Sequence, residues 1–450
     1  MSLMRFLLIA CFSLTFFSSR LVATEPDRQP NVILFVADDL GYGDISPYGG
    51  WIQTPNLERL AKSGVQFMDF HTSATVCSPT RAGLLTGLYQ QRLGIPGVLL
   101  ADPSRAEHFG GLASEHTTIA EVFREHGYRT AIFGKWHLGY QPQHNPTLHG
   151  FDEFRGFVSG NIDYQSHIDV MGREDWWLDK QRKPERGYLT DLISAHAVQF
   201  IQENAKRPFF LYLPHHAPHL PFQGPADPAD RAVGGTFPVA GSVKERKRAY
   251  REMVQSMDQG VGAIMRVLKK QGIEENTMIW FFSDNGALRI GSNAPLRGYK
   301  AEDWEGGHRV PSIFSWPDHV APRKTDALTS TLDVMPTVLD LAGIRYSGKT
   351  DGVDLSQLLL QGIAISEDRR LFWRGDQSHA WKGAAMREGP MKLVIEGGGN
   401  SRGRPNIYLF DLSRDLGEQQ NLAGQRPAEA KRMLGELSDW YKQVSQNDRN

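Results

Sequence analysis

Residues 31–39 read Asn-Val-Ile-Leu-Phe-Val-Ala-Asp-Asp, an apolar run that ends in two adjacent carboxylates. A run without polar alternation is typical of a strand buried on both faces, as in the parallel sheet of an α/β protein. The aspartates then stand at the carboxyl end of the strand, which is the edge where ligands bind in such sheets. This stretch predicts both a fold class and the place of a site.

The following sequence alternates further apolar strands with amphipathic helices. Strands are expected at residues 65–70, 128–133, 208–213 and 277–283, and helices at 55–62, 78–89, 117–126, 191–203, 244–271 and 332–342. The first helix has Thr54 in the N-cap position and a proline next, both typical of a helix start. We expect an α/β fold, with a large, mostly parallel sheet covered by helices on both faces.

The pattern changes after about Gly343. Short strands, such as residues 391–395, and a final helix at residues 427–443 follow. This predicts a smaller C-terminal α+β domain at residues 344–450, with antiparallel strands, beside a large catalytic domain at residues 25–343.

The composition excludes several classes of protein. The 450 residues include 50 Lys+Arg and 51 Asp+Glu, and this balance argues against a nucleic-acid-binding protein, which would carry a basic excess or stripe. There are two cysteines, Cys11 and Cys77. They are too few for a disulfide scaffold or a zinc site built from cysteines.

Residues 1–24 are typical of a secretory signal peptide. Arg5 precedes the apolar run 6–17, and small residues follow near Ala23. Neither this run nor any other reaches the ~20 residues needed to span a bilayer. We expect export to the periplasm or the medium. A lipoprotein acylated at Cys11 is a less favoured alternative, because the apolar run before that cysteine is very short. Export leaves Cys77 as the only cysteine, in an oxidising compartment.

Polar residues follow four of the expected strands. They are Asp38 and Asp39, then Lys135 and His137, then His215, His216 and His219, and finally Asp284 and Asn285. Because the carboxyl ends of parallel strands meet at one edge of a sheet, we expect these side chains at one rim.

Three carboxylates and one amide of this set predict a cation site, and they belong to Asp38, Asp39, Asp284 and Asn285. Adjacent acids repel one another and are costly to leave unpaired in a cleft. Ligation by oxygen alone fits Ca²⁺ more readily than Mg²⁺. The alternative is that the first pair caps a turn and the second lies at a loop tip.

Cys77 opens the stretch Cys-Ser-Pro-Thr-Arg-Ala-Gly-Leu-Leu-Thr-Gly, residues 77–87. Pro79 suits the first turn of a helix, which places Cys77 at the helix N-terminus and Arg81 one turn further on. Such a terminus favours a bound anion. From these residues alone, Cys77 is either a small buried apolar residue or a thiolate nucleophile.

The Cys-x-Pro-x-Arg pattern followed by Ala-Gly-Leu-Leu-Thr-Gly resembles the signature of the type I, formylglycine-dependent sulfatases, which are arylsulfatase-like members of the alkaline phosphatase superfamily. The resemblance extends over nearly the whole mature chain. It includes residues 31–44, 134–139, 283–286, 300–307 and 409–422. Thr80 stands where serine is commoner in the family.

The resemblance implies that a formylglycine-generating enzyme converts Cys77 to Cα-formylglycine during export. The hydrate of this aldehyde attacks sulfur with one hydroxyl and expels sulfate by means of the other. Arg81 would orient the hydrate, and His137 would be the base that releases the sulfate.

Further roles follow from the same resemblance. His219 and Lys300 would protonate the leaving alkoxide, and Lys135 and Lys300 would hold the sulfate oxygens. One calcium ion would stabilise charge on the sulfate, held by Asp38, Asp39, Asp284, Asn285 and the modified Cys77.

Two pairs of neighbouring residues receive less specific assignments. His215 and His216 have no clear counterpart in the family, and we assign them to loop structure or to the rim of the pocket. Glu305 and His308 are expected to position Lys300.

Two other classes of function are considered. A phosphatase or phosphodiesterase of the same superfamily would use a Thr or Ser nucleophile and two metals with histidine ligands. Asn285 stands where those enzymes tend to carry histidine, and no second set of carboxylates and histidines is evident. A non-catalytic glycan-binding protein would keep the fold but would be expected to lose catalytic residues, whereas all residues of the sulfatase motifs are present here. A sulfatase is therefore the favoured interpretation.

Residues 154–186 read as a long insert, and such loops usually carry specificity. The insert contains Asn161, Asp163, Tyr164, His167, Arg173, Trp176 and Trp177. Exposed tryptophans beside polar groups suit a sugar ring. We therefore expect a sulfated carbohydrate substrate, bound by Asp163, Tyr164, His167, Trp176 and Trp177. The alternative is that the two tryptophans anchor the loop on the core.

Overall fold

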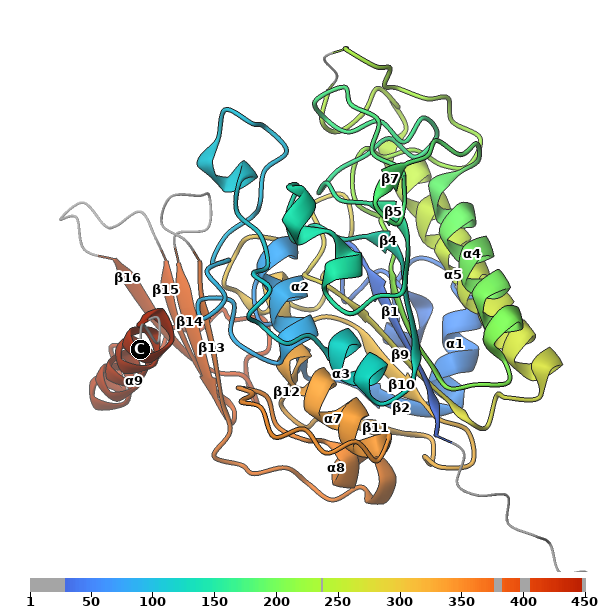
Figure 1. The fold of residues 1–450 in the computed structure, drawn as a ribbon. Helices are drawn as coiled ribbons and strands as arrows, with labels where there is room; N and C mark the ends of the chain where they lie inside the picture. Colours follow the sequence, from blue (N-terminus) through green and yellow to red (C-terminus); the bar gives the residue numbers. More distant parts are fainter. Residues whose placement is uncertain (1–28, 236–237, 376–382, 397–404, 447–450) are drawn as a thin grey trace, which may run out of the picture.

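The computed structural model describes residues 29–235, 238–375, 383–396 and 405–446, so the predicted signal peptide and Cys11 lie outside the described residues. A ten-stranded sheet forms the centre of the molecule (Figure 1). Its order is β11 (Arg323–Thr325), β2 (Gly64–Phe67), β10 (Ser312–Ser315), β9 (Thr277–Ser283), β1 (Asn31–Ala37), β8 (Phe209–Pro214), β4 (Arg129–Lys135), β5 (Glu153–Phe157), β6 (Trp177–Leu178) and β7 (Gln181–Arg182).

The middle of this sheet is parallel and its edges are mixed. β9, β1, β8, β4 and β5 run parallel, whereas β10 runs antiparallel to β9 and β2, and β6 and β7 are antiparallel at the other edge. The strand expected at residues 31–37 is confirmed at both ends. The strand expected at residues 65–70 is divided into β2 and β3 (Phe70–His71), and β3 pairs with β12 (Thr329–Ser330).

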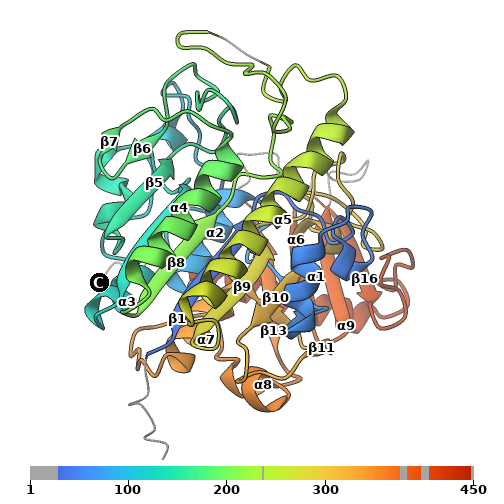
Figure 2. The ribbon, with the colours of Figure 1, turned by 90° about the vertical axis from the view of Figure 1, so that its right-hand side faces the viewer.

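Helices cover both faces of the sheet. One face carries α1 (Pro55–Lys62), α4 (Leu189–Asn204) and α5 (Arg246–Gln271) (Figure 2), and the other carries α2 (Cys77–Thr86), α3 (Ile119–Glu125), α7 (Val334–Leu341) and α8 (Ser356–Gln361). Side chains of β1 alternate between these layers, because Ile33 and Phe35 join the first core and Val32 and Leu34 the second. This arrangement confirms the predicted fold class. None of the described helices is long and apolar enough to cross a membrane.

The N-terminus of α1 corrects one local expectation. Thr54 occupies the N-cap position, but its side chain makes no capping bond and contacts Ser46 instead. The Asp258 carboxylate of α5 accepts the free backbone N–H groups of Asn56 at 3.1 Å and Leu57 at 2.8 Å. The Asp258 carboxylate of the neighbouring helix α5 therefore caps the N-terminus of α1, in place of the Thr54 side chain.

We expect Asp258→Ala to lower the free energy of unfolding by about 1–3 kcal/mol, because it leaves buried N–H groups at the start of α1 without an acceptor. Urea denaturation followed by circular dichroism measures the change. Asp258→Asn keeps one acceptor oxygen and should lose less. An unchanged stability of Asp258→Ala would contradict this capping role.

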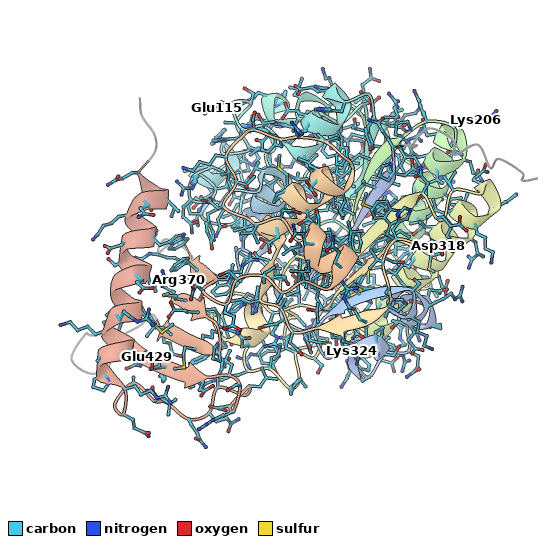
Figure 3. All side chains as sticks on the ribbon, turned by 90° about the horizontal axis from the view of Figure 1, so that it is seen from below. Glu115, Lys206, Asp318, Lys324, Arg370 and Glu429 are labelled. Carbon is cyan, nitrogen blue, oxygen red and sulfur yellow. The ribbon has the colours of Figure 1, made fainter. Side chains whose placement is uncertain are left out.

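A second, antiparallel sheet is made of β13 (Arg370–Arg374), β14 (Ala384–Glu388), β15 (Met391–Glu396) and β16 (Asn406–Asp411). The last helix, α9 (Pro427–Ser445), carries Glu429 and runs along one face of this sheet (Figure 3). On the opposite face, Trp373 and Val394 pack with Ala74 and Val76, just before Cys77. The small sheet thus supports the segment that leads to Cys77. The domain boundary at Gly343 stays a prediction.

Candidate active site

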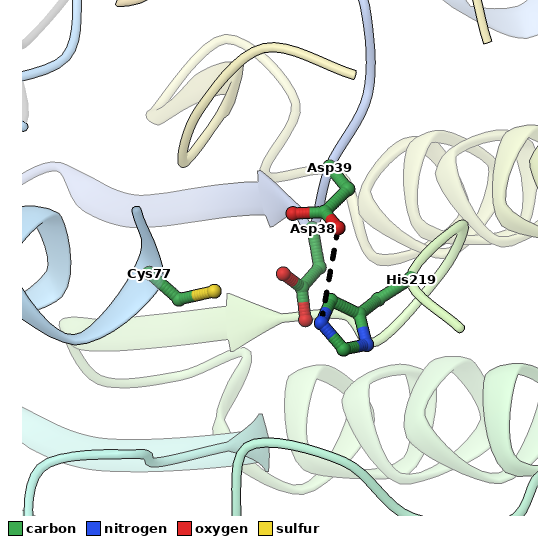
Figure 4. A group of neighbouring side chains, drawn as sticks. All are labelled: Asp38, Asp39, Cys77 and His219. Carbon is green, nitrogen blue, oxygen red and sulfur yellow. Dashed lines mark ion pairs between the residues drawn. The ribbon is translucent and has the colours of Figure 1, made fainter. Parts of the chain in front are cut away.

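The strands that carry the expected site residues are neighbours in the sheet. β9, β1, β8 and β4 lie side by side and end at Ser283, Ala37, Pro214 and Lys135. Their carboxyl ends bring the aspartates and His219 next to Cys77, the first residue of α2 (Figure 4). Each of Asp38, Asp39, Cys77 and His219 offers a ligand atom within 4.8 Å of the others.

The Cys77 side chain is a buried thiol. It is 2% exposed, and its sulfur lies 3.2 Å from the Lys300 Nζ. Burial raises the pKa of this thiol to about 11, although the ammonium groups of Lys135 and Lys300 act in the opposite direction. The side chain is therefore protonated at neutral pH, which makes it a poor nucleophile as cysteine.

The Asp38 carboxylate is held through one of its oxygens. Oδ2 accepts hydrogen bonds from Lys135 Nζ at 2.6 Å and from His216 Nδ1 at 3.2 Å. Lys135 and His216 are themselves buried. The ammonium of Lys135 is the main group that lowers the pKa of Asp38 against the opposing effect of burial. Asp38 is thus ionised and fixed in orientation.

Asp39 is arranged in the same way. Its Oδ1 accepts hydrogen bonds from Lys300 Nζ at 2.5 Å and from Asn285 Nδ2 at 2.7 Å. The other oxygens of this group are buried and have no hydrogen-bond partner, namely Asp38 Oδ1, Asp39 Oδ2 and Asn285 Oδ1. Buried oxygens without donors are costly. A hard cation that ligates oxygen would satisfy all three, so these residues fit Ca²⁺.

Arg81 and Asp284 form a buried pair beside these oxygens. Arg81 donates from Nε at 3.0 Å and from Nη2 at 2.7 Å to Asp284 Oδ2, and from Nη1 to the Lys135 carbonyl at 3.2 Å. The backbone N–H of Asp39 donates to Asp284 Oδ1 at 3.2 Å. Asp284 therefore links the guanidinium to the strand end that carries the two aspartates.

Three of the expected site residues have left-handed backbone conformations. The φ angle is 65° at Asp39, 55° at His137 and 57° at His167. Such angles cost about 1–3 kcal/mol in residues other than glycine, and they persist where surrounding contacts hold them. Strain of this kind is concentrated at functional sites.

The two expected catalytic histidines have different hydrogen-bond partners. His137 Nε2 lies 2.9 Å from the Leu99 carbonyl, and His219 Nδ1 lies 2.7 Å from the Leu220 carbonyl. The remaining nitrogen of His219, Nε2, faces Asp39 Oδ2 at 3.7 Å (Figure 4). Burial lowers the pKa of both rings. In the neutral form His219 Nε2 can only accept a proton.

His216 takes part in the site more directly than the sequence predicts. The expected place is loop structure or the pocket rim, yet the His216 imidazole donates to Asp38 and stacks with Tyr164 at 4.9 Å. Its position just beyond a buried strand is the signal that could have identified it. His215, in contrast, stacks on Phe35 at 4.5 Å within the core.

Two of the five residues predicted to bind substrate are the tryptophans, and the expectation that both are exposed is wrong for Trp176. This side chain is 3% exposed and donates to Glu185, because the insert folds it into the core beneath α4. Trp177 is half-buried and donates to Asp175 at 2.6 Å, with the Arg182 guanidinium over its ring. The tryptophans therefore anchor the insert.

The other three are also buried. Asp163 Oδ2 accepts hydrogen bonds from Gln223 Nε2 at 3.0 Å and from the backbone N–H of Asp230 at 2.8 Å. His167 Nε2 contacts the Gly187 carbonyl at 3.1 Å. Tyr164 donates its hydroxyl to the His219 carbonyl at 2.9 Å. These contacts hold the insert and the His219 loop together. That the three residues also bind substrate stays a prediction.

Glu305 does not contact Lys300, contrary to expectation. It lies 3.1 Å from Lys392 Nζ and 3.0 Å from Arg387 Nη1, both on the small sheet. Lys300 is instead held by Asp39 and Cys77. The tertiary fold supplies cations to Glu305 that lie far away in the sequence.

The structure also brings together a second set of carboxylate and histidine side chains, which was not evident from the sequence. It consists of His71, Glu305 and His308. The Lys392 ammonium already lies 3.1 Å from Glu305 and 3.2 Å from His308, so this set needs no metal ion for charge balance. Through Lys392 of β15, this set links β3 and the short helix α6 (Glu305–His308) to the small sheet.

Comparison with known proteins places the chain in a family. Residues 30–344 match the Sulfatase family, and the chain belongs to it. Arylsulfatase A of Homo sapiens is 33% identical over 451 residues, which cover 88% of this chain and 84% of the relative. N-acetylgalactosamine-6-sulfatase of Mus musculus is 35% identical over 383 residues, which cover 78% and 70%.

Solved structures agree with this assignment. The crystal structure of Ps i-CgsB superimposes with a TM-score of 0.81 at 31% identity, covering 92% of this chain and 93% of the other. A second structure of Ps i-CgsB, in complex with k-i-k-neocarrahexaose, has a TM-score of 0.80. The protein is therefore a sulfuric ester hydrolase of the alkaline phosphatase superfamily, and the resemblance read from the sequence is confirmed.

Proposed function

We propose that this protein hydrolyses sulfate esters of carbohydrates, with a formylglycine at position 77 and one bound calcium ion. The observation that carries the proposal is the position of Cys77, which is buried against Lys300 and next to the Asp38 and Asp39 carboxylates, each of which has an oxygen without a hydrogen-bond partner. A thiol with a pKa of about 11 is not the nucleophile such a site needs. The hydrated aldehyde would supply two hydroxyls on one carbon, one to attack sulfur and one to release sulfate.

The cations around position 77 suit a sulfate group. Lys300 Nζ lies beside the sulfur of Cys77, and Lys135 Nζ lies beside Asp38. We assign sulfate binding to these two ammonium groups and orientation of residue 77 to Arg81. Fixed cations around the transferring group stabilise charge in the transition state without reorganisation.

We assign proton transfer to the side chains of His137 and Lys300. His137 has one ring nitrogen without a partner and is kept neutral by burial, so it can take a proton when sulfate is released. Lys300 can donate a proton to the leaving alkoxide. His219 could share this task only when it carries a second proton, because its Nδ1 already donates to Leu220.

The calcium ligands are assigned to the acidic group on the ends of β1 and β9. Asp38, Asp39 and Asn285 each offer a buried oxygen without a partner. Asp284 and residue 77 complete the proposed set. A bound calcium ion supplies positive charge next to the sulfate.

Carbohydrate is the proposed substrate class. Ps i-CgsB, at 31% identity, has been crystallised with k-i-k-neocarrahexaose, and this supports a sulfated saccharide here. The test is sulfate release from a panel of sulfated mono-, oligo- and polysaccharides. Activity confined to small aryl or choline sulfates would exclude the carbohydrate assignment.

We expect the active protein to carry an aldehyde at position 77 after co-expression with a formylglycine-generating enzyme. Mass spectrometry of the peptide containing Cys77 should show the loss of mass from thiol to aldehyde, and a hydrazide probe should label the same peptide. Full activity in a preparation whose residue 77 is entirely thiol would refute the proposed nucleophile.

The proposal includes export and a division into two domains. Residues 1–24 would be removed, and maturation of residue 77 would accompany export. The catalytic domain would comprise residues 25–343 and the small domain 344–450. N-terminal sequencing of the exported protein tests the cleavage: a mature chain that still begins at residue 1 would exclude it.

A further inference from the structure

The hydrogen bond of His137 determines which ring nitrogen carries the proton. The Leu99 carbonyl can only accept, so the His137 Nε2 that lies 2.9 Å away must carry the hydrogen. Burial keeps the ring neutral. The proton is therefore on Nε2, and Nδ1 carries a lone pair. Nδ1 is buried and has no hydrogen-bond partner.

The Leu99 carbonyl is itself held in place by a side chain. The Tyr140 hydroxyl donates to this carbonyl at 3.2 Å and accepts the backbone N–H of Gly160 at 3.3 Å. The Tyr140 ring stacks on His108 at 5.0 Å, which fixes the hydroxyl from the other side. The Leu99 carbonyl oxygen thus accepts hydrogen bonds from two side chains, His137 and Tyr140, and the second is itself held by Gly160 and His108.

The His137 ring is also confined by its backbone and by Gly160. The backbone N–H of His137 donates to the Val158 carbonyl at 3.2 Å, and the φ angle of the residue is 55°. A Cβ at Gly160 would lie 2.4 Å from Nε2, so only glycine leaves room for the ring. The imidazole therefore has little freedom to turn over.

We infer that Tyr140 is a positioning residue, whose hydroxyl holds the Leu99 carbonyl so that His137 keeps its proton on Nε2 and presents Nδ1 as the proton acceptor. During sulfate release the Nδ1 lone pair would take the proton of the free hydroxyl at residue 77. The oxygen of this hydroxyl forms the C=O bond of the aldehyde while the bond from the same carbon to the sulfate oxygen breaks. Sulfate leaves with that electron pair, and His137 then passes the proton to solvent. This inference rests on the proposed function, because it assigns an atom to the base in that reaction.

The tautomer is tested in the resting protein by ¹⁵N NMR of histidine-labelled enzyme, with His137→Ala used to assign the signal. The two nitrogens of a neutral imidazole differ widely in chemical shift according to which carries hydrogen. We expect the non-protonated signal from Nδ1 in the wild type, and exchange between the tautomers in Tyr140→Phe. A proton on Nδ1 in the wild type would overturn the inference.

The kinetic test compares Tyr140→Phe with Tyr188→Phe, which loses a hydroxyl donated to the Gln223 carbonyl instead. We expect Tyr140→Phe to lower kcat about 3–10-fold with KM unchanged, and Tyr188→Phe to change neither. The Tyr140 effect should disappear in a His137→Ala background, because the two residues act through one ring. Equal effects in both backgrounds would refute the positioning role.

These readouts separate the inference from the proposed function. If the matured wild type releases no sulfate from any ester, the proposed function fails, whereas the NMR signal still reports the tautomer. If sulfate is released but His137 carries its proton on Nδ1, the inference alone fails.

Discussion

Replacing Cys77 with alanine is expected to abolish sulfate ester hydrolysis, with a fall in kcat of about 10⁵-fold or more. The methyl group cannot become an aldehyde, so the nucleophile and the means of releasing sulfate are lost together. Sulfate release from an aryl sulfate and from a sulfated saccharide measures the effect. The variant should still fold, because Cys77 is a small buried residue and alanine removes only its sulfur.

The matched control is the wild-type chain produced without the formylglycine-generating enzyme. It keeps the thiol and all surrounding contacts, and it should be as inactive as Cys77→Ala with an unchanged melting temperature. Turnover by Cys77→Ala above one hundredth of the wild-type rate would contradict the assignment of residue 77 as nucleophile.

The second large effect is expected from Asp39→Asn. Asparagine can still accept the hydrogen bond from Lys300 through its oxygen, but it places an NH₂ group where the unpartnered Oδ2 of Asp39 stands. This donor would repel a cation. We expect kcat to fall about 10³-fold, because charge stabilisation beside the sulfate is lost.

Calcium binding to Asp39→Asn can be measured without activity. Adding Ca²⁺ should raise the melting temperature of the wild type, since a ligand that binds the folded state stabilises it, and should not raise that of the variant. Asp258→Asn, which changes a buried carboxylate outside the site, should keep the full calcium response. An equal calcium response in wild type and Asp39→Asn would exclude Asp39 as a ligand.

The local sequence determined the fold class and most of the rim. The run Asn31–Ala37 is apolar at every position but the first, and it forms a strand buried on both faces. The polar residues after this strand and after β4, β8 and β9 lie at the carboxyl ends of parallel strands, so a rule about strand ends was enough to select them. Pro79 likewise predicted where α2 begins, because helix ends depend on nearby residues. The helix was expected to reach residue 89, but it ends at Thr86, with Gly87 in the left-handed C-cap conformation.

Only the tertiary structure decided how the selected side chains are used. Strand order makes β9, β1, β8 and β4 neighbours, and this order is not encoded in any one strand. The same packing brings His216 onto Asp38, Asp258 onto the start of α1 and Lys392 onto Glu305. Each partner lies far away along the chain, so no local pattern of residues could identify it.

Tertiary packing also determines which side chains of the insert, residues 154–186, are buried. A tryptophan in a long loop can stack on a sugar or on the core, and its neighbours in sequence are equally polar in both cases. Trp176 packs on the core because α4 lies next to it, with the His196 ring stacked on the indole. Local periodicity determines which residues form an element, whereas long-range packing determines which of their atoms remain available for chemistry.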